Sequence, residues 1–106
     1  MLKETEELFN SAMLLHKSVH GDKNFNQLID QACEECAELI VALQHYRRKR
    51  VSAAEVLEEY VDIGINLEPI LKEMGFTPED SEKVLHRKVQ KFYDKVRRLY
   101  EGSTYV

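Results

Sequence analysis

Residues 26–47, NQLIDQACEECAELIVALQHYR, decide the fold class of this chain. Their apolar side chains recur every three or four positions, which is the spacing of one face of an α-helix. The rest of the chain shows the same spacing, and no useful length of it alternates apolar and polar residues with the period of two that a half-buried strand requires. The sequence therefore predicts an all-α fold.

We expect four helices. The first covers about residues 3–19 and ends near Gly21, and the second covers residues 26–47. A basic connection at residues 47–51 follows, and its first residues suit a helix C-terminus because cations interact favourably with that end of the helix dipole. The first helix has one apolar side, formed by Leu8, Ala12, Leu15 and Val19.

The third helix is expected to open at Ser52, with Glu55 completing a capping box, and to end at Gly75. Pro69 lies inside it and should kink it or cost it a hydrogen bond. The fourth helix should begin with Thr77 as the cap and Pro78 at the first helical position, and residues 102–106 should fray. Its apolar stripe consists of Leu85, Val89, Phe92, Val96 and Leu99.

The length of 106 residues fits a single domain, residues 1–106, with an adequate core of its own. No run of apolar residues approaches the roughly 20 that a membrane span needs. The N-terminal sequence MLKETEE has no export-signal character, so we expect a cytoplasmic protein without a membrane partner. The pair Cys33 and Cys36 would then sit in a reducing compartment as free thiols.

The net charge of −4 is divided unevenly along the chain. Residues 1–70 carry 7 Lys/Arg against 13 Asp/Glu, whereas residues 83–98 carry seven basic side chains and one acidic one. The two regions could face one anionic, metal-bridged ligand, or each could be an ordinary solvated helix face. An acidic protein is a poor candidate for binding duplex nucleic acid without sequence preference.

Two matched pairs of acids border the apolar faces of the second and third helices. Glu35 and Glu38 are about 60° apart around the second helix, and Glu59 and Asp62 are about 60° apart around the third, with Asn66 one turn further on. If the two apolar flanks pack together, four carboxylates converge beside the core. The flanks consist of Ala32, Leu39 and Leu43 on one helix and Val56, Ile63 and Leu67 on the other.

Such a cluster is costly unless a cation neutralises it. Two carboxylates about 4 Å apart repel by roughly 1 kcal/mol in bulk water and about 4 kcal/mol at an effective dielectric constant of 20. Oxygen ligands with room for water and phosphate suit Mg²⁺, with Mn²⁺ as a substitute. A single Glu-x-x-Glu face would be an ordinary solvated surface, but a second pair on the adjoining helix favours a metal site.

The acids also match a family pattern. Glu34-Glu35-x-x-Glu38, a spacer of twenty residues and Glu59-x-x-Asp62 resemble the MazG-like branch of the all-α nucleoside triphosphate pyrophosphohydrolases, over about 45 residues from Gln27 to Leu71. The resemblance implies a helical bundle completed as a homodimer or homotetramer, Mg²⁺ dependence, and hydrolysis of an NTP or dNTP to the monophosphate and pyrophosphate. It places the metal on Glu35, Glu38, Glu59 and Asp62, with Glu34 in a supporting role.

In that mechanism one motif carboxylate, Glu35 or Glu38, accepts a proton from the attacking water. Lys88, Lys91 and Lys95 lie on one flank of the fourth helix and could contact the outer phosphates, although a lysine at such a position is more often simply solvated. Asn66 could orient a metal-bound water or the nucleotide, or it could cap a helix contact. The motif does not specify the base or the sugar.

Other chemistry finds less support in the sequence. Cys33 and Cys36 form only half a zinc site and are expected to be small core residues. No glycine-rich phosphate loop and no Glu-x-x-His pair of a di-iron bundle is present. The alternative to an enzyme is a noncatalytic helical module that binds nucleotide or metal. The third helix is apolar nearly all round, with Leu57, Val61, Gly64 and Ile65 opposite its inner flank, so self-association is expected.

Overall fold

The computed structural model describes residues 2–104, and every regular element in that range is a helix. Four α-helices, α1 (Lys3–His20), α2 (Asn24–Arg47), α3 (Ala53–Glu73) and α4 (Pro78–Thr104), are accompanied by a short 3₁₀ helix, η1 (Gly21–Lys23). The prediction of an all-α fold is confirmed. The helices within the described range are all too short or too polar to cross a lipid bilayer.

The chain divides into two compact units, residues 1–74 and residues 75–106. The first contains α1, η1, α2 and α3, and the second contains α4. The prediction of one domain over residues 1–106 stays a prediction.

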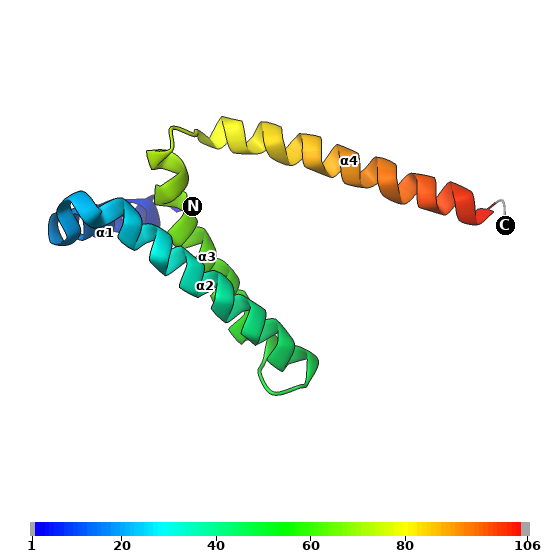
Figure 1. Cartoon of the computed structure of the whole chain (residues 1–106), viewed down its shortest axis with the longest axis horizontal. Coiled ribbons are helices and arrows are strands. Elements are labelled where there is room, and N and C mark those ends of the chain that lie inside the picture. Colours follow the sequence, from blue (N-terminus) through cyan, green and yellow to red (C-terminus); the bar gives the residue numbers. More distant parts are fainter. Residues whose placement is uncertain (1, 105–106) are drawn as a thin grey trace. The chain divides into compact units, whose positions relative to one another are not determined.

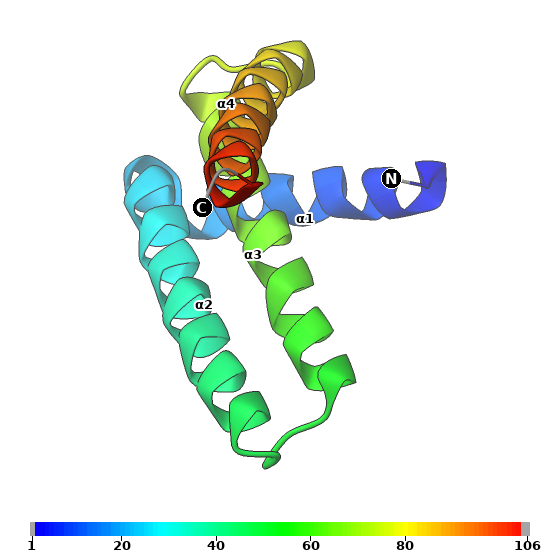
Figure 2. The same cartoon turned by 90° about the vertical axis from the view of Figure 1, so that its right-hand side faces the viewer.

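Helices α2 and α3 lie side by side and form the main contact of the first unit (Figures 1 and 2). The turn between them is closed by backbone hydrogen bonds from Lys49 N to Tyr46 O (2.9 Å) and from Arg50 N to His45 O (2.8 Å). Lys49 adopts a left-handed conformation with φ of 61°, which costs a residue with a Cβ atom roughly 1–2 kcal/mol. The basic connection is therefore an ordered, strained turn.

The ends of α3 follow the sequence signals. Ser52 Oγ accepts a hydrogen bond from Glu55 N at 3.3 Å, which satisfies one of the backbone donors at the start of the helix. At the other end Gly75 has φ of 91°, a conformation that glycine adopts at no steric cost. Pro69 lies inside the helix, which continues past it to Glu73.

The core of the first unit is small and lies where α2 begins and α3 ends. Leu28, Ala32 and Ile70 are buried, and Met13, Phe25 and Ile29 pack against them. Packing of the predicted flanks is partial: Leu39, Val56 and Ile63 are half-buried, whereas Leu43 and Leu67 are exposed.

Helix α1 buries a different face from the one that its apolar pattern suggested. Leu8, Leu15 and Val19 are exposed, each by 68% or more, whereas the half-buried side chains are Phe9, Met13, His16 and His20. The short η1 leads directly into α2, which starts at Asn24 rather than Asn26, and Met13 of α1 and Phe25 of α2 both pack against the buried core. The expected apolar side is left without cover in the described residues.

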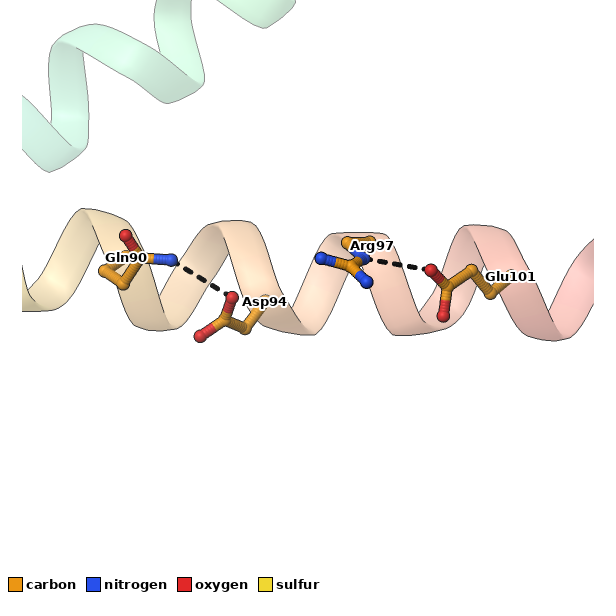
Figure 3. Close-up of polar contacts among 4 residues, drawn as sticks. All are labelled: Gln90, Asp94, Arg97 and Glu101. Atoms are coloured by element: carbon orange, nitrogen blue, oxygen red, sulfur yellow. Dashed lines mark hydrogen bonds and ion pairs between the residues drawn. The ribbon is translucent and has the colours of Figure 1, made fainter.

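Helix α4 begins as expected and ends later than expected. Thr77 Oγ1 accepts from Asp80 N at 3.2 Å while Asp80 Oδ2 accepts from Thr77 N at 2.8 Å, so the two residues cap the helix reciprocally around Pro78. The prediction that residues 102–106 fray is wrong for 102–104, which remain helical; residues 105–106 lie outside the described range. A continuing i to i+4 ladder stabilises this end, as the ion pair of Arg97 with Glu101 at 2.9 Å shows (Figure 3).

Candidate metal centre

Three of the four predicted metal ligands meet between α2 and α3. Glu35 and Glu38 on α2 and Glu59 on α3 each offer a carboxylate oxygen, and these oxygens lie within 4.8 Å of one another. One turn of α2 separates the first two acids, and the side-by-side packing of the helices brings the third to them. The helical hairpin thus gathers acids that are far apart in the sequence.

Two of these acids carry shielded oxygens. Glu35 and Glu59 are half-buried, whereas Glu38 is exposed. Glu35 Oε2 and Glu59 Oε2 have almost no contact with solvent and no hydrogen-bond partner among the described residues. Shielding a charged oxygen without a partner is unfavourable, so the two carboxylates carry an electrostatic cost in this structure.

The same two acids have pKa values raised above the ordinary value of a glutamate. Burial raises the pKa of Glu35 above its ordinary value of 4.5, and the charges of Glu38, Asp62 and Glu59 raise it further. Burial likewise raises the pKa of Glu59, and the next largest cause is the charge of Glu38. When Glu35 or Glu59 is protonated, it can share its proton with Glu38 in a side-chain hydrogen bond. This hydrogen bond also raises the pKa of Glu35 and of Glu59.

The fourth predicted ligand, Asp62, stands slightly apart. It is close enough to raise the pKa of both Glu35 and Glu59, but it is not among the three residues whose oxygens converge. Asn66 Nδ2 donates to the backbone carbonyl of Asp62 at 2.7 Å. The Asn66 amide therefore caps a turn of its own helix in this structure.

The remaining predicted site residues are placed as follows. Glu34 is exposed on α2 and is not among the three converging acids. Lys88, Lys91 and Lys95 are exposed on α4 and belong to the unit of residues 75–106, whereas the acids belong to the unit of residues 1–74. Their role toward phosphate stays a prediction.

The donor set fits a hard divalent cation. Three carboxylates supply only oxygen ligands, two of the oxygens lack any donor, and the exposed side of Glu38 leaves room for water or phosphate. Magnesium prefers such a set and usually keeps several waters, and manganese accepts the same ligands. Soft metals are disfavoured because no sulfur or imidazole ligand joins the group.

The two cysteines differ from expectation. Cys33 and Cys36 are free and exposed, so the prediction that they are small core residues is wrong for the single chain. Both follow the same helix as the acids, but the packed side of α2 is formed by Leu28 and Ala32.

A histidine pair was not foreseen by the sequence analysis. The rings of His16 and His20 lie 4.3 Å apart between centroids on α1. His16 Nδ1 donates to Asn24 Oδ1, and its Nε2 atom is shielded without a partner in the described part of the chain. The i, i+4 spacing of the two histidines was the available signal.

Comparisons with protein-family models, with curated proteins and with solved structures gave no match for this chain.

Proposed function

We propose that this chain is a Mg²⁺-dependent nucleotide pyrophosphohydrolase of the MazG-like kind, which converts an NTP or dNTP to the monophosphate and pyrophosphate. One observation carries the proposal: Glu35 and Glu59, from two different helices, hold shielded oxygens without partners beside Glu38. The spacing of Glu34, Glu35, Glu38, Glu59 and Asp62 that resembles this family supports the choice of reaction. Removal of unusual nucleotides from the pool is the role that such an activity would serve.

The carboxylates would hold the ion and handle the proton. Glu35, Glu38 and Glu59 are its proposed ligands, with Asp62 joining from one turn further along α3 and Glu34 supporting them. Magnesium at this place supplies positive charge for the phosphates and acidifies a water. Glu35, which is half-buried, or Glu38, which is exposed, would accept the proton of the attacking water.

Four further side chains complete the proposed substrate site. Lys88, Lys91 and Lys95 are the proposed contacts to the outer phosphates. Asn66 would contact the nucleotide or a water through the carbonyl oxygen of its amide, since the amide nitrogen is bonded to Asp62 O. Positive side chains at the outer phosphates would offset charge that develops on the leaving pyrophosphate.

The proposal includes self-association into a homodimer or homotetramer, in which chains complete a four-helix bundle. The outer face of α3 supports it. Leu57, Val61 and Ile65 are exposed by 61%, 47% and 45%, although α3 is the helix that also supplies Ile70 to the core. A helix that is apolar on several sides is buried on several sides, and residues 2–74 cover only one.

A noncatalytic module that binds a metal or a nucleotide is the alternative. The position of Asp62 favours it, because three converging acids suffice to bind an ion while the fourth stands apart. The two functions differ in one product: only the enzyme releases pyrophosphate.

The test is to incubate the purified chain with Mg²⁺ and a panel of canonical and modified NTPs and dNTPs, and to separate monophosphate, diphosphate and pyrophosphate. We expect monophosphate and pyrophosphate in equal amounts from at least one nucleotide. Glu38→Gln should abolish their release, whereas Glu68→Gln, an exposed acid of α3 outside the cluster, should not. No pyrophosphate from any nucleotide would reject the enzyme and leave the binding module.

A further inference from the structure

Helix α4 carries an apolar seam with the spacing of a coiled coil. Its members follow one another at intervals of four, three, four and three residues, which is the a/d pattern of the heptad repeat. Their side chains are exposed by between 46% and 67%, and no second element of residues 75–104 covers them. The seam consists of Leu85, Val89, Phe92, Val96 and Leu99.

The opposite side of the helix is polar and internally paired. Gln90 Nε2 donates to Asp94 Oδ1 at 3.1 Å, and Arg97 Nε donates to Glu101 Oε1 at 2.9 Å (Figure 3). With Val89 at position a, these four residues occupy positions b and f, the outermost positions of a coiled coil. Val84, at position c, is the one aliphatic residue on this side between residues 82 and 101. The helix therefore has one narrow apolar seam rather than the wide stripe of a helix packed against several others.

We propose that α4 pairs with α4 of a second copy of this chain as a parallel, two-stranded coiled coil. The residue types on the seam select two strands: β-branched Val89 and Val96 occupy the a positions, and Leu85 and Leu99 occupy d positions. Glu82, at the preceding a position, ends the seam because two copies would bring like charges together.

The flanking residues select the parallel orientation. Lys88 and Lys95 occupy the g positions, and Tyr93 and Tyr100 occupy the e positions. In a parallel pair each g residue faces the e residue five positions later on the partner, so Lys88 meets Tyr93 and Lys95 meets Tyr100, with cation–π attraction. In an antiparallel pair g faces g, and lysines would repel lysines. Lys88 and Lys95 thus have a candidate role besides phosphate contact.

The interface differs from the one proposed on α3 and does not depend on nucleotide hydrolysis. It also excludes a different use of the seam, in which α4 folds back to cover residues 1–74 of its own chain. The two uses differ in whether residue 89 of one copy lies next to residue 89 of another.

Disulfide trapping in the full chain tests this. In a background with Cys33→Ser and Cys36→Ser, Val89→Cys places one thiol in the seam, and the matched control Gln90→Cys places it on the outer face. We expect Val89→Cys to form a covalent dimer under mild oxidation at micromolar concentration and Gln90→Cys to remain monomeric on a non-reducing gel. Circular dichroism of both reduced variants should match the wild type.

Three results would overturn the proposal. Trapping of both variants to the same extent would mean unspecific collision. Trapping only in a mixture of Val89→Cys with Leu99→Cys chains, and not of Val89→Cys with itself, would mean an antiparallel pair, in which a positions face d positions. Absence of trapping in the Val89→Cys variant, together with a wild-type mass of 12.4 kDa by light scattering, would mean that the seam is covered within the chain.

Discussion

Glu35 on α2 and Glu59 on α3 approach each other with carboxylate oxygens that lie within 4.8 Å, and each holds its Oε2 atom shielded and without a hydrogen-bond donor among residues 2–104. Both acids consequently have a raised pKa, mainly through burial. A hairpin built only for stability would place neutral or oppositely charged residues at such a contact. The cation that we propose for this site would therefore offset an electrostatic cost of the metal-free fold.

The metal-free protein should lose stability as the pH rises. The folded-state pKa of Glu35 and Glu59 lies above 4.5, so folding binds their protons, and this contribution is lost as the pH rises from about 4.5 through the folded-state pKa values. Thermal unfolding in a chelator, at pH values from 4 to 8, measures it. The difference between the wild type and Glu35→Gln/Glu59→Gln should grow with pH, with the variant the more stable. A pH-independent difference would mean that the cluster is fully solvated.

Magnesium or manganese should raise the unfolding temperature. A ligand that binds only the folded state adds about 2.7 kcal/mol at a hundred times its dissociation constant, which is several degrees for a domain of this size. Glu35→Gln/Asp62→Asn should remove the shift, and Glu68→Gln should keep it. If the double variant responds to metal like the wild type, the ion binds elsewhere.

The exposed face of α3 should be a subunit contact. Val61→Glu or Ile65→Glu would bury an unpaired carboxylate there, which costs several kcal/mol and should split or unfold the particle. Light scattering of the wild type should give at least twice the 12.4 kDa chain mass, and the exposed control Glu73→Lys, on another side of α3, should leave that mass unchanged. A wild-type mass of one chain would contradict self-association through this face.

One substitution in the turn between α2 and α3, Lys49→Gly, should stabilise the protein. Lys49 holds φ of 61°, and glycine adopts this conformation without the steric cost, so Lys49→Gly should raise the free energy of unfolding by about 1 kcal/mol at most. Lys49→Ala keeps the Cβ atom and serves as the control for loss of the charge. Equal stabilities of the two variants, measured by urea unfolding, would show that the turn relaxes.

Local signals predicted the ends of the helices well. Ser52, Gly75 and the Thr77–Pro78 pair mark the ends of α3 and the start of α4 because caps and left-handed turns depend on residues adjacent in sequence. The convergence of Glu35, Glu38 and Glu59 was also accessible, since helical geometry alone puts matched acids beside matched apolar flanks.

Tertiary choices were harder to predict. Helix α1 is apolar on more than one side, so its sequence does not say whether Leu8 and Leu15 or Phe9 and Met13 face α2. Met13 and Phe25 pack against the core from either side of η1, a single turn with no strong sequence signal. The exposure of Cys36 and the engagement of Asn66 Nδ2 with Asp62 O likewise follow from side-chain packing that periodicity does not determine.

Direct measurement of Mn²⁺ binding tests the central claim, that acids from two helices jointly hold one divalent cation. Titration followed by the electron paramagnetic resonance of free Mn²⁺ should show saturable binding to the wild type and to Glu68→Gln at matched pH and ionic strength. Glu59→Gln, which removes a charge from the cluster with little change of volume, should weaken that binding at least tenfold while the helical content stays the same. Binding by Glu59→Gln as tight as that by the wild type would contradict the account.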